Sequence, residues 1–169
     1  MVLYFGYGSN MSKRVLEGVR NIHPKRSQSA ILKGYKIIIN MPGPNFIEPG
    51  FANILPMKGK NVEGVLHEIS ETDLARIVAS EGEDYKLVKV KIKFFGKLVE
   101  AQTLVFKSSL QTDLPTSKRY KKILINAALD NALSEEYVNE LRDKQAVYYP
   151  LLSEYYAVMV YFWVKKRAN

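Results

Sequence analysis

Two short stretches of this 169-residue chain carry groups suited to binding an anion and to moving a proton. Gly8-Ser9-Asn10 ends an apolar run that begins at Leu3, and Glu81-Gly82 precedes the most regular predicted strand. A glycine-containing turn before a helix directs several backbone N–H groups at one place, which suits a carboxylate or an oxyanion. Partial burial, with Glu83 and Asp84 as neighbours, is expected to raise the pKa of Glu81 and make it a general base.

Each stretch also has a purely structural explanation, which the sequence leaves open. A Gly-Ser-Asn turn is an ordinary start for a capped helix, and acidic turns are usually solvated. The chain has no cysteine, which excludes a thiolate nucleophile and disulfides. The two histidines, His23 and His67, have no metal-ligand spacing, so we expect structural or solvated roles for them and no metal site.

The elements that position these groups follow from the hydrophobic pattern. We expect a loop over 20–29, a turn over 56–61, and strands over 3–7, 35–41, 51–55, 62–69, 85–94 and 100–106. Pro42-Gly43-Pro44-Asn45 predicts a break that opens a long loop. Helices are expected after Asn10 or Ser12, over 71–79, after Ser117 and over 135–144.

Composition indicates one globular domain: 47% of the residues are hydrophobic, and the length allows a substantial core. The formal charge of +8 is compatible with a nucleic-acid or anionic-membrane partner. However, Lys89, Lys91 and Lys93 alternate with apolar residues, as on a solvated sheet face. We therefore favour a solvated face over a nucleic-acid-binding patch and expect no nucleic-acid partner. The N-terminus lacks the pattern of a secretory signal, and together with the lack of cysteine this favours a cytoplasmic protein.

The C-terminal stretch is unusual because residues 155–164 are uncharged, aromatic and β-branched, and are followed by Lys165-Lys166-Arg167. The run is shorter than the ~20 residues that a membrane span needs. We therefore expect a strand or a buried interface and no stable membrane insertion. This divides the chain into a domain over 1–147 and an extension over 148–169 that packs on the domain or at an interface. A homodimer is left open.

The segment Phe5-Gly6-Tyr7-Gly8-Ser9-Asn10-Met11 resembles the N-terminal signature of the gamma-glutamylcyclotransferase-like family, which includes AIG2-like and gamma-glutamylamine cyclotransferase relatives. Four later segments resemble that family in the same order, so that the likeness extends from Leu3 to Leu141. They are Gly50-Phe51-Ala52-Asn53-Ile54, Ser80-Glu81-Gly82 with Tyr85, the stretch from Pro115 through Tyr120 to Ile123, and Leu133-Ser134-Glu135-Glu136-Tyr137.

The resemblance implies an α+β fold with a closed or strongly curved, mainly antiparallel, barrel-like sheet of about six strands flanked by helices. It implies an acyl-transferring enzyme that cyclises the gamma-glutamyl group of an amino acid, amine or peptide to 5-oxoproline, as in glutathione metabolism. Glu81 would be the catalytic acid/base, and no metal or cofactor would be needed, because the nucleophile belongs to the substrate. The implied substrate-binding residues are Tyr7, Gly8, Ser9, Asn10, Met11, Tyr85 and Tyr120. The alternative is a catalytically silent module that binds a small molecule on the same fold.

Overall fold

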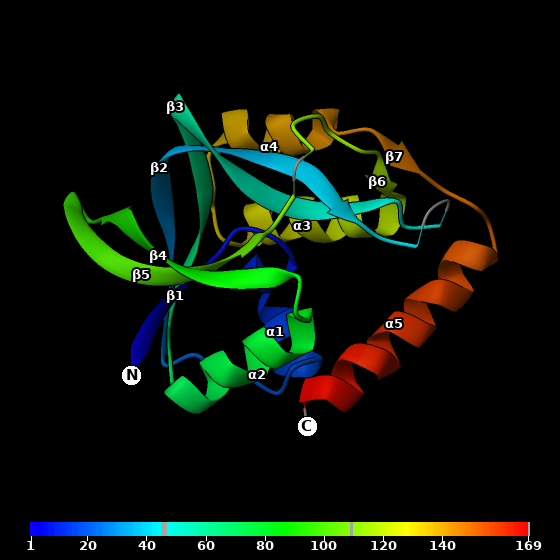
Figure 1. Cartoon of the computed structure of the whole chain (residues 1–169), viewed down its shortest axis with the longest axis horizontal. Helices are drawn as coiled ribbons and strands as arrows, with labels where there is room; N and C mark the ends of the chain where they lie inside the picture. The colour runs from blue at the N-terminus through cyan, green and yellow to red at the C-terminus, as the bar shows by residue number, and fades with distance from the viewer. Residues whose placement is uncertain (45–46, 109, 169) are drawn as a thin grey trace.

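The computed structural model describes residues 1–44, 47–108 and 110–168, and a closed barrel of five strands lies at its centre (Figure 1). The strands follow one another round the barrel in the order β1-β3-β2-β4-β5. Their bounds are Val2–Gly6 for β1, Arg26–Pro42 for β2, Gly50–Ile69 for β3, Tyr85–Phe94 for β4 and Lys97–Phe106 for β5. Only the closing pair, β1 with β5, is parallel among these. The predicted α+β barrel is confirmed, with five strands in place of about six.

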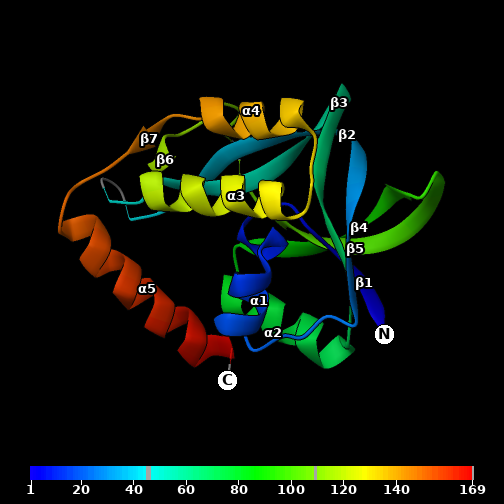
Figure 2. The same cartoon turned by 180° about the vertical axis from the view of Figure 1, so that it is seen from behind.

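Helices surround this barrel on several sides. A 3-10 turn, η1, covers Ser9–Met11, and the α-helices are α1 Lys13–Gly18, α2 Glu71–Glu81, α3 Lys118–Asp130, α4 Glu135–Asp143 and α5 Leu152–Ala168. Two short strands, β6 Thr116–Ser117 and β7 Ala146–Val147, pair with each other. The pair α3 and α4 lies behind the β2–β3 ribbon in Figure 1 and in front of it in Figure 2.

Serine caps start four of these helices. Ser12, Ser70, Ser117 and Ser134 each accept a hydrogen bond from the backbone N–H three residues later. A serine hydroxyl in this position satisfies one of the N–H groups that a helix start leaves unpaired. The sequence-based helix starts are therefore confirmed, and Ser12, not Asn10, is the cap of α1.

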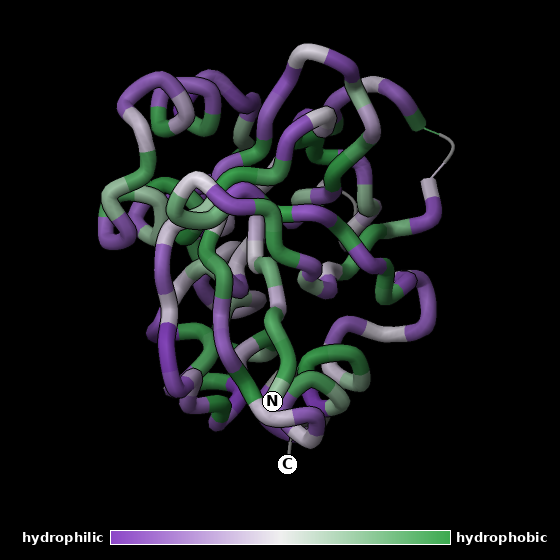
Figure 3. Tube along the Cα trace, turned by 90° about the vertical axis from the view of Figure 1, so that its left-hand side faces the viewer, coloured by the Kyte–Doolittle hydropathy of each residue, from purple (hydrophilic) through white to green (hydrophobic). Residues whose placement is uncertain are grey.

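The hairpin of β4 and β5 is the best-predicted part of the sheet. Its strands pair from Tyr85 with Phe106 to Phe94 with Lys97. Val90 and Ile92 are buried, whereas Lys89, Lys91 and Lys93 are exposed. Figure 3 shows the resulting alternation of hydrophobic and hydrophilic residues along the strands. These lysines form a solvated face, as expected.

Two predicted boundaries in β2 and β3 are wrong. The loop expected over 20–29 ends early, because β2 begins at Arg26, and the turn expected over 56–61 lies within the continuous strand β3. The pairing of β3 with β2 jumps from Asn61–Lys33 to Pro56–Tyr35, so an irregularity in the ribbon absorbs these residues. The break expected after Pro42 does end β2, although Asn45 lies outside the described residues.

The strand expected within residues 155–164 is also wrong, because this stretch lies in α5. The barrel is closed, and a helix satisfies its own backbone groups without a neighbouring strand. In Figures 1 and 2, α5 runs along one side of the molecule and approaches α2, with which it is in contact. Among the described residues, no helix has both the length and the apolar character that a membrane crossing requires.

The chain folds back sharply over the end of β1. A Cβ atom on Gly6 would lie 2.9 Å from the carbonyl oxygen of Asn10, so only glycine allows this approach. His67, which pairs with Tyr4 across β1 and β3, holds the same carbonyl through Nε2 at 3.0 Å. The carbonyl can only accept, so Nε2 carries the hydrogen and Nδ1 accepts from the Ser27 hydroxyl at 2.8 Å.

A side chain takes the place of backbone pairing where β1 has ended. Tyr4 of β1 lies opposite Gln102 of β5, so Phe106 of β5 is level with residues beyond the end of β1. There, Asn53 of β3 accepts a hydrogen bond from the N–H of Phe106 at 2.9 Å and donates one to its carbonyl at 3.1 Å. Asn53 thus joins β3 to β5 as a backbone segment would.

We predict that His67 makes the fold sensitive to acid. Burial lowers the pKa of His67 to about 4, below its ordinary value of 6.5, because the charged ring is desolvated. The unfolded chain therefore binds this proton first, and the contribution of neutral His67 is complete above pH 6.5 and is lost as the pH falls towards 4. The difference corresponds to about 3 kcal/mol of unfolding free energy.

Urea unfolding of wild type and His67→Gln between pH 7 and pH 4 measures this contribution. The wild-type free energy of unfolding should fall more steeply with decreasing pH than that of His67→Gln. The exposed His23, changed to Gln, is the matched control. Parallel curves for wild type and His67→Gln would contradict the assignment.

Candidate active site

The predicted site residues meet at a cleft between the end of β1, the end of α2 and the start of α3. About 310 Å³ of space is free of protein atoms there, a volume that includes open solvent. The lining residues are Tyr4, Tyr7, Gly8, Ser9, Asn10, Ala52, Glu81, Tyr85, Leu104 and Tyr120. Six of the ten lie in the two stretches from which the sequence analysis started: five lie within residues 3–10, and the sixth is Glu81. Segments more than 70 positions apart in the chain thus form one site.

Glu81 is the last residue of α2, two residues beyond the predicted end of this helix. Gly82 follows with φ +92°, a left-handed conformation that glycine adopts without strain and that ends the helix. The Glu81 side chain is 20% exposed, whereas its neighbours Glu83 and Asp84 are exposed. A helix end therefore presents the Glu81 carboxylate to the cleft.

The immediate partner of Glu81 is a cation that the sequence analysis did not identify. Arg20 donates from Nη2 to Oε1 of Glu81 at 2.5 Å, and its other terminal nitrogen donates to the hydroxyl of Ser80. The Arg20 side chain is only 4% exposed. A buried guanidinium needs a paired anion, so this ion pair stabilises the fold and also holds Glu81 at the site.

Asn10 adds a second donor to the same carboxylate oxygen. Its Nδ2 lies 3.0 Å from Oε1 of Glu81 and 3.0 Å from the hydroxyl of Tyr4. Two donors therefore hold Oε1, and Oε2 is the carboxylate oxygen that these contacts leave for a ligand. Oδ1 of Asn10 is buried without a hydrogen-bond partner among the described residues.

The opposite side of the cleft is formed by Tyr120 and the backbone at Gly8. The Tyr120 hydroxyl accepts a hydrogen bond from the N–H of Ala52 at 3.3 Å and also interacts with the backbone of Ser9. A Cβ atom on Gly8 would lie 3.2 Å from this hydroxyl. The lack of a side chain at Gly8 therefore keeps the cleft open beside Tyr120.

A buried ion pair anchors this wall. Glu48 is fully buried, and it accepts two hydrogen bonds of 2.6 Å from Arg119 and one of 2.5 Å from Ser117. Thr116 donates to the carbonyl of Gly50 at 2.6 Å. The start of β3 is thus fixed to the start of α3, next to Tyr120.

The cleft tyrosines remain hydrogen-bond donors at neutral pH. Burial raises the pKa of Tyr4, Tyr7, Tyr85 and Tyr120, and the negative charge of Glu81 raises each of them further. The Tyr7 hydroxyl donates to the carbonyl of Leu104 at 2.6 Å. Because the Tyr120 hydroxyl accepts from backbone N–H groups, its own hydrogen is available to a ligand.

The structure brings seven of the eight predicted site residues to the cleft, and Met11 is the exception. Its side chain is 1% exposed and belongs to the main hydrophobic core. The sequence analysis missed Tyr4, Arg20, Ala52 and Leu104. Tyr4 and Ala52 lie within segments that it singled out, whereas Arg20 stood at the edge of a predicted polar loop and had no sequence signal.

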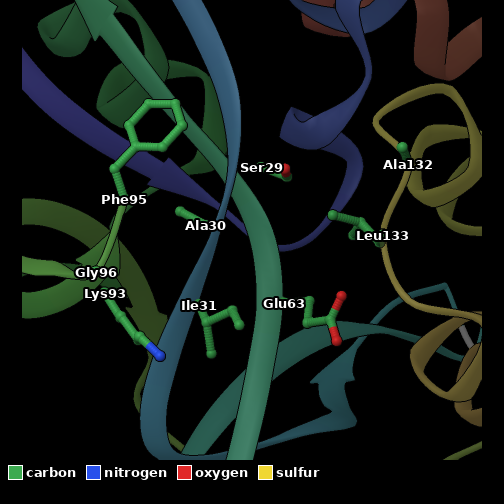
Figure 4. A pocket seen from close by; sticks show the side chains of 9 residues that line it. All are labelled: Ser29, Ala30, Ile31, Glu63, Lys93, Phe95, Gly96, Ala132 and Leu133. Atoms are coloured by element: carbon green, nitrogen blue, oxygen red, sulfur yellow. The ribbon is translucent and has the colours of Figure 1, made fainter.

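A larger hollow lies elsewhere, between β2, the β4–β5 hairpin and the α3–α4 connection (Figure 4), and its volume of about 550 Å³ also includes open solvent. None of the predicted site residues lines it. Its acidic residue, Glu63, accepts hydrogen bonds from both the N–H and the hydroxyl of Ser134. Glu63 thus serves to fix the start of α4.

Residues 1–44, 47–108 and 110–168 contain no group of three or more acidic, histidine or cysteine side chains placed to hold a metal ion. The absence of a metal and of a cofactor from the reaction remains a prediction from the sequence.

Comparisons with known proteins agree on one family. The family model described as the AIG2-like family matches residues 61–141, which include Glu81 and Tyr120. The human gamma-glutamylcyclotransferase is 29% identical over 149 residues, covering 83% of this chain and 77% of the relative. The gamma-glutamyl cyclotransferase aclK of Aspergillus oryzae is 23% identical, and the match covers 89% of this chain but only 63% of the longer fungal protein.

A solved structure named gamma-glutamyl cyclotransferase has the same fold, with a TM-score of 0.78 and 23% identity over 94% of this chain and 97% of that chain. The matched family model and the named relatives show that this chain is similar to AIG2-like proteins and gamma-glutamylcyclotransferases, and the solved structure shows the common fold.

Proposed function

We propose that this protein cyclises the gamma-glutamyl group of a gamma-glutamyl amino acid, amine or peptide to 5-oxoproline and releases the amine. One observation carries the proposal: Glu81, held by Arg20 and Asn10, lines a small cleft together with Gly8, Ser9 and Asn10. The names of the relatives support the same reaction. The relevant ligand is thus a small molecule and not a nucleic acid, and the proposed location is the cytoplasm.

The proposed reaction is an intramolecular acyl transfer. The α-amino nitrogen of the substrate attacks its own γ-carbonyl carbon, so that a new C–N bond closes the five-membered ring. The bond from that carbon to the leaving nitrogen then breaks. Oε2 of Glu81 accepts the proton that the attacking amine loses and returns it to the leaving amine. No water is consumed, and no enzyme nucleophile is required.

The remaining cleft groups would bind and orient the substrate. The backbone N–H groups of Gly8 and Asn10 suit the α-carboxylate or the oxygen of the tetrahedral intermediate. Tyr120, whose hydroxyl hydrogen is available, can donate to the same oxygen. Tyr7 and Tyr85 provide aromatic lining of the cleft. Holding the amine and the carbonyl carbon in contact supplies a further part of the rate enhancement.

The first prediction concerns Glu81→Gln, which keeps the shape of the side chain but cannot take up a proton. We expect 5-oxoproline release from a panel of gamma-glutamyl amino acids, gamma-glutamyl amines and glutathione to fall by about 10²–10⁴-fold. The thermal midpoint of unfolding shows whether the variant is folded.

Glu83→Gln is the matched control, because Glu83 is an exposed carboxylate two residues away and should retain wild-type turnover. Wild-type activity in folded Glu81→Gln would refute the catalytic assignment. If wild type itself turned over no member of the panel, the chain would be better described as a binding module.

The second prediction assigns Arg20 as a positioning residue. Arg20→Lys keeps the positive charge but cannot contact Ser80 and Glu81 at the same time with a planar fork. We expect kcat to fall between about tenfold and about a hundredfold, because Glu81 is misplaced, while KM changes little. Arg76→Lys, on the exposed side of α2 and paired with Asp73, is the control. An unchanged kcat in Arg20→Lys would show that Arg20 has no part in orienting the carboxylate.

The third prediction concerns Gly8→Ala. Gly8 has φ −107° and ψ −141°, outside the main regions that alanine adopts, so a thermal-unfolding measurement first shows whether the variant is folded. The added methyl group would crowd the Tyr120 hydroxyl, and we expect kcat/KM to fall by about tenfold or more. Gly18→Ala in α1, where a Cβ meets nothing within 4 Å, is the control. Equal kcat/KM for the two variants would argue against substrate binding beside Gly8.

A further inference from the structure

The turn of the β4–β5 hairpin contains an apolar side chain at a position that disfavours it. Phe94 of β4 pairs with Lys97 of β5, so Phe95 and Gly96 between them form the turn. Both have positive φ, +45° and +76°, as in a type I′ turn. Glycine, asparagine and aspartate adopt this conformation readily, whereas a bulky side chain seldom does. The needs of the turn therefore do not explain a phenylalanine at position 95.

The Phe95 side chain also lies almost entirely in water. It is 77% exposed, and Leu98, close by on β5, is 66% exposed. The Phe95 ring touches the ring of Phe94, with 4.6 Å between their centroids, and Phe94 is itself only half-buried. The hairpin projects beyond the barrel in Figures 1 and 2, and Figure 4 shows the Phe95 ring extending from the turn. Two large apolar side chains thus meet solvent at a projecting corner of the molecule.

Lysines lie beside these apolar residues on the outer face of the sheet. The strand register places Lys93 opposite Leu98 of β5 and opposite Ile31 of β2. Lys91 points to the same face as Lys93, and Lys97 adjoins Leu98; all three lysines are exposed. None of the three forms an ion pair within residues 1–44, 47–108 and 110–168. The hairpin-tip patch is the name used here for Lys91, Lys93, Phe95, Lys97 and Leu98.

Two carboxylates on the same face of the sheet are engaged by other groups. Glu100 lies opposite Lys91, but its Oε1 is 2.9 Å from Nζ of Lys89. Glu63 of β3 accepts hydrogen bonds from the N–H and the hydroxyl of Ser134. The hairpin-tip patch therefore combines net positive charge with exposed apolar surface.

This combination fits the surface of an anionic lipid bilayer. The negative potential of acidic headgroups attracts each nearby lysine, which corresponds to about fivefold in affinity per lysine. Apolar side chains gain free energy when they leave water for the boundary between headgroups and acyl chains. A nucleic-acid duplex would attract the lysines equally, but it offers no apolar layer for Phe95 and Leu98. The apolar residues therefore favour a lipid surface as the partner.

We propose that the hairpin-tip patch binds peripherally to anionic membranes. Phe95 and Leu98 enter the boundary between headgroups and acyl chains, and the lysines lie at the level of the lipid phosphates. Tyr85, which lines the cleft, begins β4, and Phe94 ends it. Ten residues of strand span about 30 Å, so the cleft remains open to solution while the hairpin tip contacts lipid.

The first experiment measures co-sedimentation with vesicles of phosphatidylcholine, with and without phosphatidylserine. Wild type should bind only the vesicles that contain phosphatidylserine, and binding should weaken as salt is raised. Phe95→Asn should bind about tenfold more weakly or less, because the apolar wedge is lost. Its thermal midpoint of unfolding should be at least that of wild type, because asparagine suits the turn. Loss of binding then cannot be attributed to misfolding.

A charge-matched pair of variants tests the lysines. Lys91→Glu combined with Lys93→Glu should weaken vesicle binding by more than about tenfold. Lys13→Glu combined with Lys122→Glu changes the net charge equally, at exposed positions on α1 and α3. This control should bind nearly as well as wild type, because salt screens charges that lie far from the contact.

Fluorescence identifies the part of the molecule that touches lipid. The natural chain contains one tryptophan, Trp163 on α5. Phe95→Trp combined with Trp163→Phe places the single indole at the hairpin tip. Its emission should shift to shorter wavelength when vesicles with phosphatidylserine are added, because the indole leaves water. The emission of wild type should stay unchanged.

Four results would overturn the proposal. Wild type does not bind the vesicles with phosphatidylserine, or Phe95→Asn binds them as tightly as wild type. The emission of Trp163 shifts while that of the indole at position 95 does not, which would assign the lipid contact to α5. A DNA duplex binds wild type and Phe95→Asn equally and more tightly than the vesicles do, which would make a nucleic acid the partner of the lysines.

Discussion

The ion pair between Arg20 and Glu81 is the interaction on which the site depends. A guanidinium that is 4% exposed cannot remain without an acceptor, so the segment after α1 and the end of α2 must meet. The pair also offsets an unfavourable placement, because a carboxylate at the last turn of a helix faces the negative end of the helix dipole. Asn10 joins the same oxygen and brings in the loop after β1. One buried charge thus draws three separate segments to one cleft.

The wall on the far side of the cleft is built on the same physical principle. Glu48 is fully buried against Arg119 and Ser117, and this contact fixes the start of β3 to the start of α3. Tyr120 directly follows Arg119 on α3. Both walls are therefore positioned by buried ion pairs. Moving either partner away would leave an unpaired buried charge and destabilise the fold. The space between the walls is consequently set by the fold and not by exposed loops.

The sequence was most informative where structure is determined by near neighbours. The caps at Ser70 and Ser134, the β4–β5 hairpin and the turn at Gly8 each depend on residues within a few positions, and each could be predicted. Arg20 could not, because its partner lies 61 residues away and nothing beside it marks it as buried. The strand expected in the tail was wrong because β-branched and aromatic residues favour strands only where a partner edge exists. The barrel closes on itself, and the tail forms α5.

The bond between Asn53 and Phe106 has a consequence for how this cleft can change. Ala52 of β3 and Leu104 of β5 line the cleft, and side chains hydrogen-bond the backbone of both: Tyr120 receives the N–H of Ala52, and Tyr7 donates to the carbonyl of Leu104. The cleft therefore lies where β3 and β5 are joined by side chains, here called the seam. The lengths of the Asn53, Tyr120 and Tyr7 side chains set its width. Longer or shorter side chains at these positions would widen or narrow the seam while the strand register elsewhere stays the same. Substitutions at the seam would thus change the shape of the cleft without rebuilding the barrel.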